Sequence, residues 1–301
     1  MVEALVLGIV LGGIIALGAV GLSLLYAILR FGHFAHGDLM TLGAYLALAM
    51  LAGPAAWLGL RDVPFRPLSI GPGLVLATIL AAAIITVIVW FVDAAVYAPM
   101  RRRGSDVTLI AFASLAIAII VRSIVYMVWG PQPYRYSTEL QQAIRLPLGA
   151  RIKPDELFSL AVVILIVIAL YLFLERTKIG RAMRATADNP ELARISGIDT
   201  ARVIRWTWAI GAGLLTVGGV LYGIQSQLQP VMGWNFLLAF FAATILGSVG
   251  NIYGALVGSM VVGIVQQVST LWISPGYKPG VALAVLILLL LIRPQGLFAK
   301  E

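Results

Sequence analysis

The chain has 301 residues, of which 61% are hydrophobic and only 11% are charged, and its mean hydropathy is +0.99. A soluble domain is about half apolar and about one quarter charged, so this composition excludes a soluble enzyme, a disordered chain and a nucleic-acid-binding protein, despite a net charge of +8. The absence of cysteine excludes a disulfide scaffold, a zinc-finger site and thiol catalysis. The length suits roughly eight to ten transmembrane or half-spanning helices of about 20 residues each, which predicts an all-α polytopic membrane protein with a single transmembrane domain over residues 1–301.

The first apolar run, residues 5–29, carries glycines at near-helical spacing that would let a neighbouring helix approach closely. It is too long for the apolar part of a cleaved signal and follows no basic residues, so we expect it to be a membrane helix. After the polar stretch 30–38, the apolar segment 39–52 spans only if the residues before it also lie in the membrane. A proline-rich loop at 53–72 and a span at 73–92 follow.

The rest of the chain alternates basic or polar connections with apolar runs. A basic loop at 98–104 precedes a span at 107–129, and a polar connection at 130–156 precedes a span at 157–174. Beyond the basic segment 175–205, the remaining apolar runs are 206–224, 237–249, 255–272 and 281–292.

Basic residues predict the orientation. The arginines at 101–103 and the segment 175–205 are separated by two spans, so they share a side, which the positive-inside rule makes cytoplasmic. The segment 130–156 and the N-terminus then lie outside, and the C-terminal tail lies inside.

Two histidines and an aspartate stand out in the stretch 30–38. His33 and His36 share a helix face, but no glutamate lies between them and no cysteine completes a ligand set, so we predict no metal site. The favoured interpretation is a polar bend in which Asp38 caps the next helix, with lining of a solute pathway as an additional role. A triad drawn from Ser23, His36 and Asp38 rests on composition alone, and we predict no catalytic residue.

Two further ionisable residues lie at or near membrane depth. Arg122 lies inside a span, so we expect it to face a partner carboxylate or the bundle interior, although the sequence does not identify the carboxylate. Asp93 lies at the end of a span, where snorkelling to the interface is the simpler interpretation.

The segment 175–205 predicts a shaped cytoplasmic surface rather than an ordinary solvated loop. Residues 176–187 resemble the end of a helix with a basic face, and a short amphiphilic helix over 190–196 follows. Four residues set the ends of this short helix: Asn189 as N-cap, Pro190 at the first helical position, Glu191 beside the positive N-terminus, and Gly197 as left-handed cap.

A run of glycines occupies residues 246–258. No Gly-Lys pair occurs anywhere in the chain, so the Walker A phosphate loop is absent and the chain cannot hydrolyse ATP by that route. Close helix packing is the better interpretation, with Gly250 and Gly254 as a pair of small residues on one helix face. The predicted packing residues are Gly247, Gly250, Gly254 and Gly258.

Four stretches in order along the chain carry a family resemblance. They are Phe-Ala-His-Gly-Asp-Leu-Met with Gly-Ala-Tyr at 34–45, Val-Tyr-Ala-Pro-Met-Arg at 96–101, the segment 177–199, and the glycine region 230–258. Together they resemble the membrane permease of a branched-chain amino acid ABC transporter, the LivH/LivM family, and the N-terminal stretch with the short length resembles the LivH type.

The resemblance implies an ABC importer permease fold and a function in uptake. This chain would form the translocation pathway for branched-chain amino acids or a related small polar solute, such as other amino acids, amides or urea. Its implied partners are a LivM-like second permease subunit, two cytoplasmic ATPase subunits and an extracytoplasmic solute-binding protein, within the lipid membrane and without nucleic acid. ATP and magnesium would bind the ATPase subunits, so no cofactor is expected on this chain. The implied location is the plasma (inner) membrane of a bacterium or archaeon, as a multi-pass protein.

The resemblance also assigns residues. Those of the substrate pathway would be Phe34, His36, Gly37, Asp38, Thr41 and Tyr45. Those of ATPase coupling would be Gly180, Arg181, Arg184, Ala185, Asp188, Asn189, Pro190, Glu191, Ala193, Gly197 and Ile198.

Two alternatives remain open at this point. A secondary carrier or channel would use paired broken helices near the midplane, which only the stretch 30–38 and the late glycine region suggest, and no coupling acid lies deep in a late span. An intramembrane enzyme would need a further ligand or nucleophile facing His33, His36 and Asp38. Neighbouring genes for ATPases and a binding protein would favour the importer.

Overall fold

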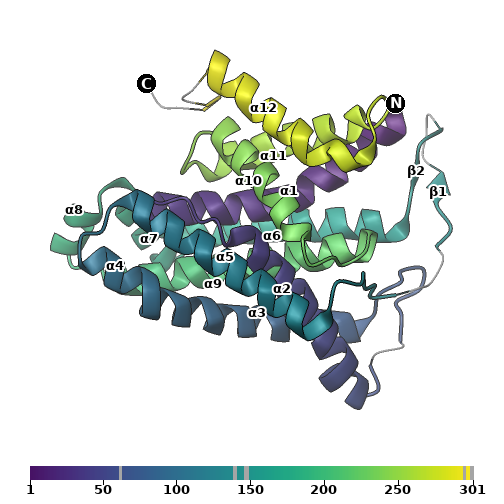
Figure 1. Cartoon of the computed structure of the whole chain (residues 1–301), viewed down its shortest axis with the longest axis horizontal. Coiled ribbons are helices and arrows are strands. Elements are labelled where there is room, and N and C mark those ends of the chain that lie inside the picture. The colour runs from purple at the N-terminus through teal and green to yellow at the C-terminus, as the bar shows by residue number, and fades with distance from the viewer. Residues whose placement is uncertain (61–62, 138–140, 146–148, 294–295, 299–301) are drawn as a thin grey trace.

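A computed structural model describes residues 1–60, 63–137, 141–145, 149–293 and 296–298. Over these residues the chain is a helical bundle in which eight helices are long and apolar enough to cross a membrane, which confirms the predicted all-α polytopic class (Figure 1). The helices are α1 (Val2–Leu29), α2 (His36–Met50), α3 (Pro72–Val92), α4 (Ala98–Arg102), α5 (Val107–Trp129), α6 (Pro154–Arg176), α7 (Lys178–Asp188), α8 (Pro190–Ile195), α9 (Thr200–Gln225), α10 (Met232–Leu246), α11 (Ile252–Ser269) and α12 (Lys278–Ile292). A short hairpin pairs β1 (Ile144–Arg145) antiparallel with β2 (Arg151–Ile152), and a 3-10 turn, Pro275–Tyr277, precedes α12.

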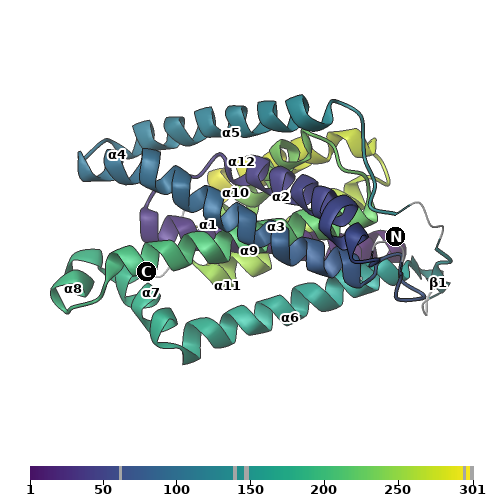
Figure 2. The same ribbon diagram turned by 90° about the horizontal axis from the view of Figure 1, so that it is seen from below.

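The bundle has two distinct ends. In both Figure 1 and Figure 2, α4, α7 and α8 lie at one end, and the N-terminus and the hairpin lie at the other. Following the orientation that the basic residues predict, we call these the inner end and the outer end. The basic segments of the sequence therefore do meet at one end of the molecule.

Helix α1 is the centre of the bundle, and its glycines explain how closely its neighbours approach. A Cβ placed on Gly8 would lie 2.8 Å from the Cα of Ile264, and one placed on Gly263 would lie 2.3 Å from the Cα of Gly12. The backbones of α1 and α11 are thus in direct contact, as the glycine spacing predicts.

Two helices begin inside the bundle rather than at its ends. After α1 ends near the inner end, residues 30–35 turn back along it, and His36 at the start of α2 contacts the carbonyl of Gly18 halfway along α1. Helix α10 likewise begins beside the start of α2, where the N–H of Gly233 donates to Oγ1 of Thr41 at 2.9 Å. From this meeting point α2 runs toward the outer end and α10 toward the inner end.

The packing partners of these two half-helices repeat. Helix α2 packs against α9, α3 and α5, and α10 packs against α1, α11 and α12. The chain thus has the arrangement of two inverted copies, each with a long span followed by a half-helix. The first copy is α1, α2, α3 and α5, and the second, in the same order, is α9, α10, α11 and α12.

Two predicted loop boundaries are wrong for the same physical reason. Helix α2 continues through a π-helical turn, Leu51–Ala55, which contains Pro54, and α3 continues through a π-helical turn, Asp93–Tyr97, into α4. The loop expected from residue 53 and the basic loop expected from residue 98 therefore begin as helix. Proline has no backbone N–H to donate. A π-helical turn shifts the backbone hydrogen-bond register, so the helix can continue past such a residue.

Candidate functional site

The meeting point of α2 and α10 is a contact between two backbones. A Cβ on Gly37 would lie 2.1 Å from the carbonyl oxygen of Gly233, and a Cβ on Gly233 would lie 1.7 Å from that of Gly37. Neither position therefore accepts a larger residue without moving a helix. We call this contact, together with Asp38, Arg122 and Trp234, the junction.

A charged pair holds the junction to α5. Nε of Arg122 donates to Oδ1 of Asp38 at 2.9 Å, and Nη2 donates to Oδ2 at 2.8 Å. The guanidinium carbon lies 4.6 Å from the ring centroid of Trp234, which is a cation–π distance. One arginine on α5 thus contacts the first turn of α2 and the first turn of α10. This bidentate pair is the carboxylate partner that the sequence leaves unidentified, and it means that the predicted role of Asp38 as a helix cap is wrong, since Ala35 is the N-cap residue of α2.

The outer edge of this arginine is not covered by the chain. The Asp38 side chain is fully buried, but that of Arg122 is 22% exposed, and among the described residues Nη1 has no hydrogen-bond partner. Arg122 lies seven residues before the last residue of α5, or about 10 Å along the helix from its outer end. Because hydrocarbon cannot solvate a guanidinium, this face must meet water, a polar solute or another subunit rather than lipid tails.

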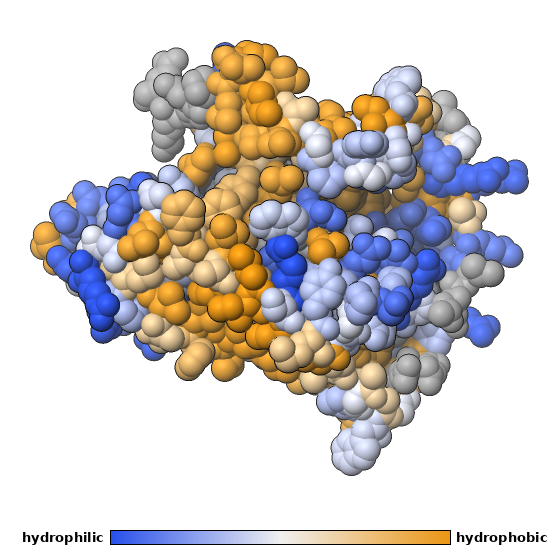
Figure 3. Space-filling model, viewed as in Figure 1, coloured by the Kyte–Doolittle hydropathy of each residue, from blue (hydrophilic) through white to orange (hydrophobic). Residues whose placement is uncertain are grey.

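The surface around the junction agrees with this inference. Figure 3, in which α5 lies in front, shows hydrophilic residues extending from the outer end to the middle of this face, while apolar residues cover much of the inner part. Trp234 is 39% exposed and Asn235 beside it is also exposed. This face is therefore a candidate wall of a solute pathway.

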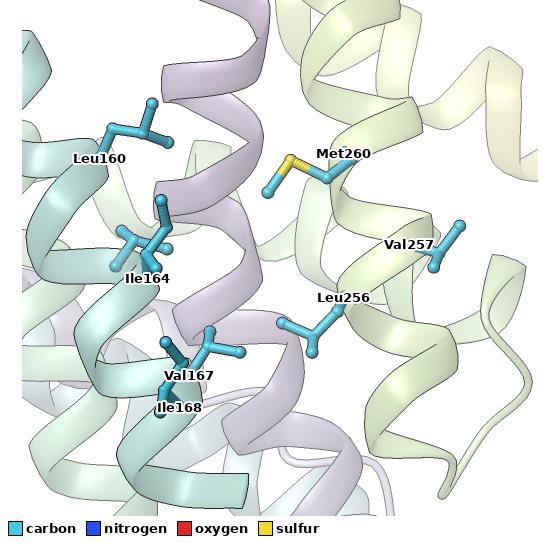
Figure 4. A pocket seen from close by; sticks show the side chains of 8 residues that line it. Leu160, Ile164, Val167, Ile168, Leu256, Val257 and Met260 are labelled. Atoms are coloured by element: carbon cyan, nitrogen blue, oxygen red, sulfur yellow. The ribbon is translucent and has the colours of Figure 1, made fainter.

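The apolar groove in Figure 4 has a different character. It lies between α6 and α11, has a volume of about 270 Å³, and is lined only by apolar side chains, among them Ile164, Leu256 and Met260. It offers no donor or acceptor for a polar solute, so it is not a candidate pathway.

The two histidines lie in a buried aromatic cluster behind the junction. Nε2 of His33 is 3.2 Å from the hydroxyl of Tyr97, and its ring packs edge-on against Trp208 at 5.0 Å between centroids. Nε2 of His36 is 2.9 Å from the carbonyl oxygen of Gly18. Over the described part of the chain, no group of three or more His, Asp or Glu side chains lies together as a metal would require.

The predicted pathway residues fall in two positions. Phe34 is half-buried against Phe241, and its N–H donates to Ser114. His36, Asp38, Thr41 and Tyr45 are buried within the single chain, and Arg122, which the predicted pathway residues did not include, extends from Asp38 to the surface. Their role in a pathway stays a prediction. The signal for Arg122 was available, since a charge inside a span requires a partner.

At the inner end, the predicted short helix has the predicted caps. Oδ1 of Asn189 accepts hydrogen bonds from the N–H groups of Glu191 and Leu192, Pro190 is the first residue of α8, and Gly197 has a φ of +83°. Ala193 is buried, whereas Leu192 and Ile195 are 60% and 80% exposed. The short helix therefore presents two apolar side chains outward.

The residues before this helix have more specific roles than the sequence suggests. Thr177 ends α6 and caps α7 by accepting from the N–H of Gly180, so α7 is a separate helix rather than the end of α6. A Cβ on Gly180 would lie 2.3 Å from the carbonyl oxygen of Leu174, which requires glycine at this corner. Arg181 and Arg184 are both exposed, but Arg184 also donates to the same carbonyl oxygen and pairs with Glu175 at 2.9 Å.

The remaining predicted coupling residues line the same surface. Asp188 and Ala185 lie in the last turns of α7, and the N–H of Ile198 donates to the carbonyl of Ala193 at 3.0 Å, which closes the end of α8. Coupling itself stays a prediction.

The late glycines divide into packing and turn residues. A Cβ on Gly254 would lie 1.7 Å from the carbonyl oxygen of Gly247, and one on Gly258 would lie 2.2 Å from that of Ala243, so these glycines let α11 pack on α10. Gly250 instead lies in the turn between the two helices with a φ of +85°. Its predicted pairing with Gly254 on one helix face is wrong, because Gly250 lies before the first residue of α11 and is not part of that helix.

Similarity to known proteins extends along almost the whole chain. Residues 4–290 match the family model described as branched-chain amino acid transport system / permease component. The permease protein LivH of Escherichia coli K12, of a high-affinity branched-chain amino acid transport system, is 30% identical over 298 residues, covering 97% of this chain and 94% of the relative. BraD of Pseudomonas aeruginosa, with the same description, is 28% identical over 99% of this chain and 95% of its own length. A probable LivH of Methanocaldococcus jannaschii is 28% identical over 96% of this chain and 90% of its own length. No solved structure matches the chain.

Proposed function

Because this chain belongs to the family of branched-chain amino acid transport system permease components, we propose that it is a membrane-spanning subunit of an ATP-driven importer of branched-chain amino acids or a related small polar solute. The chain is a transport subunit rather than an enzyme, and ATP with magnesium binds its ATPase partners. Its place is the plasma (inner) membrane of a bacterium or archaeon.

The observation that carries this proposal is the uncovered edge of Arg122 at membrane depth. The guanidinium is partly exposed about 10 Å from the outer end of α5, a position that favours water or another polar surface over lipid tails. A second permease subunit, LivM-like, facing α5 and the start of α10 would enclose this polar face and leave a solute pathway between the two chains. The solute then passes the junction, where α2 and α10 begin.

The surface formed by α7 and α8 is the proposed contact with the two ATPase subunits. Leu192 and Ile195 offer apolar anchors on a short helix whose ends are fixed by Asn189 and Gly197. Arg181 adds an exposed positive charge. Arg184 already binds within the chain, so its charge is less available to a partner.

A secondary carrier is the second candidate, and one observation favours it. Two half-helices that start near the midplane and belong to inverted repeats are the usual frame of such carriers. Against it, the relatives that match nearly the whole length are named as permease proteins of transport systems.

The deciding experiment is gentle purification of the tagged chain from its native membrane, followed by mass spectrometry. Co-purification of a second permease subunit and two ATPases is the expected result. Isolation of the chain alone or as a homo-oligomer, even after cross-linking, would favour a carrier or channel.

A further inference from the structure

The outer end carries a group of exposed basic side chains. The four residues are exposed, and among the described residues none forms an ion pair: Arg135, Arg145, Arg151 and Lys153. Among the described residues, the acids nearest to them along the chain, Asp155 and Glu156, both accept hydrogen bonds within the chain. Asp155 accepts from the N–H and the hydroxyl of Ser69, and Glu156 accepts from the backbone N–H of Lys153 at 2.8 Å.

Two of these arginines lie in an unfavourable position. Arg145 and Arg151 are directly opposite each other in the β1–β2 pair, and like charges in that position destabilise a hairpin. The hairpin has only two residues in each strand, so it has little other stabilisation. Basic residues outside the membrane also run against the usual bias that keeps them inside. A favourable interaction with an acidic surface would offset both costs.

The basic segment is connected to both half-helices. Tyr134 and Leu228 exchange two backbone hydrogen bonds, at 3.0 and 2.8 Å, which ties the segment to the link that enters α10. The hydroxyl of Tyr136 donates to the carbonyl of Ala44 in α2 at 2.7 Å, and burial raises the pKa of Tyr136, which keeps this donor protonated. A partner bound at the outer end therefore contacts a segment that reaches the junction by two routes.

A polar groove adjoins the basic residues. It has a volume of about 420 Å³, and its lining is mixed in charge, with Arg135 and Lys153 beside Asp155, Glu156 and Gln225. Such a recess suits the entry of side chains from a partner surface.

We propose that Arg135, Arg145, Arg151 and Lys153 form the docking surface for an acidic face of the extracytoplasmic solute-binding protein of this transport system. This inference rests on the proposed function. Complementary charge of this kind raises the rate of association and makes that rate sensitive to salt.

The test uses the complete transporter in nanodiscs of zwitterionic lipid and the solute-binding protein of the same transport system. Association is measured by surface plasmon resonance between low and high salt for the wild type and for Arg145→Glu/Arg151→Glu. We expect the variant to associate about tenfold more slowly at low salt and to lose most of the salt dependence. Single Arg145→Glu is compared with single Arg103→Glu, because Arg103 is also exposed but lies at the inner end.

Each outcome has one meaning. A double variant that associates as fast as the wild type overturns the proposal. So does a loss in Arg103→Glu equal to that in Arg145→Glu, which would indicate a general charge effect. A wild-type salt dependence that appears only when anionic lipid is added assigns the patch to lipid headgroups and also overturns it. If the wild-type transporter shows no ATPase stimulation by the binding protein at any salt concentration, the proposed function fails instead. Basal ATPase activity of all three variants equal to wild type excludes misfolding as the cause.

Discussion

Removing Arg122 while leaving Asp38 in place is the sharpest test of the junction. In Arg122→Met the buried carboxylate loses both of its charge-assisted hydrogen bonds, because both come from this one guanidinium. Removal of one partner of a buried pair costs about 3–5 kcal/mol. At about 2–3 °C per kcal/mol for a chain of this size, the midpoint of thermal unfolding should fall by roughly 6–15 °C.

The double variant separates charge from packing. In Asp38→Asn/Arg122→Met the uncompensated charge is gone and only a buried amide remains, which costs about 1–3 kcal/mol. The double variant should therefore be more stable than Arg122→Met alone, by about 2 kcal/mol. Arg103→Met is the control, since Arg103 is exposed at the inner end. The assay is thermal unfolding of the purified transporter followed by fluorescence-detected size exclusion. A single variant as stable as the control, or a double variant less stable than the single, would refute the reasoning.

Three further changes test other parts of the chain. Gly233→Val places a side chain where a Cβ already lies 1.7 Å from the carbonyl oxygen of Gly37, so assembled protein should be absent from membranes by immunoblot, and normal levels would contradict a backbone contact. Gly197→Val meets open space but a φ of +83°, so it should cost about 1–2 kcal/mol locally and slow ATP-driven uptake at normal expression. Ile195→Asp, at a side chain 80% exposed, should leave the unfolding midpoint unchanged and reduce ATPase co-purification by about tenfold or more, whereas equal co-purification would remove α8 from the interface.

Local signals in the sequence predict a large part of this fold. The apolar runs predict where the eight long helices lie, and the caps of α8 follow from side chains that bind their own backbone within a few residues. The segment 39–52 also gives a correct warning, since a run too short to span indicates a helix that begins inside the membrane.

The features that the sequence does not predict depend on contacts between distant residues. The pairing of Asp38 with Arg122 spans 84 positions, and that of Thr41 with Gly233 spans 192. Both the cap assigned to Asp38 and the helix face assigned to Gly250 are local interpretations that a tertiary contact or a turn replaces. The π-helical turns around Pro54 and Asp93 are likewise not predicted by the sequence. At both places the apolar helical pattern gives way to residues typical of loops, although the helix continues.

The glycine contact between α2 and α10 also has a mechanical consequence. If α2 and α10 tilt as one body, this contact is their fulcrum, because neither Gly37 nor Gly233 has a side chain that can yield. Helix α10 is an arm of 15 residues, about 22 Å long, so a tilt of about 5° moves its inner tip by about 2 Å. That tip leads into the turn at Ser248–Gly250, which borders the same groove as Met183 and Arg184 of α7. The arm formed by α2 then moves the opposite way at the outer end, so one pivot reverses a displacement between the two sides of the membrane.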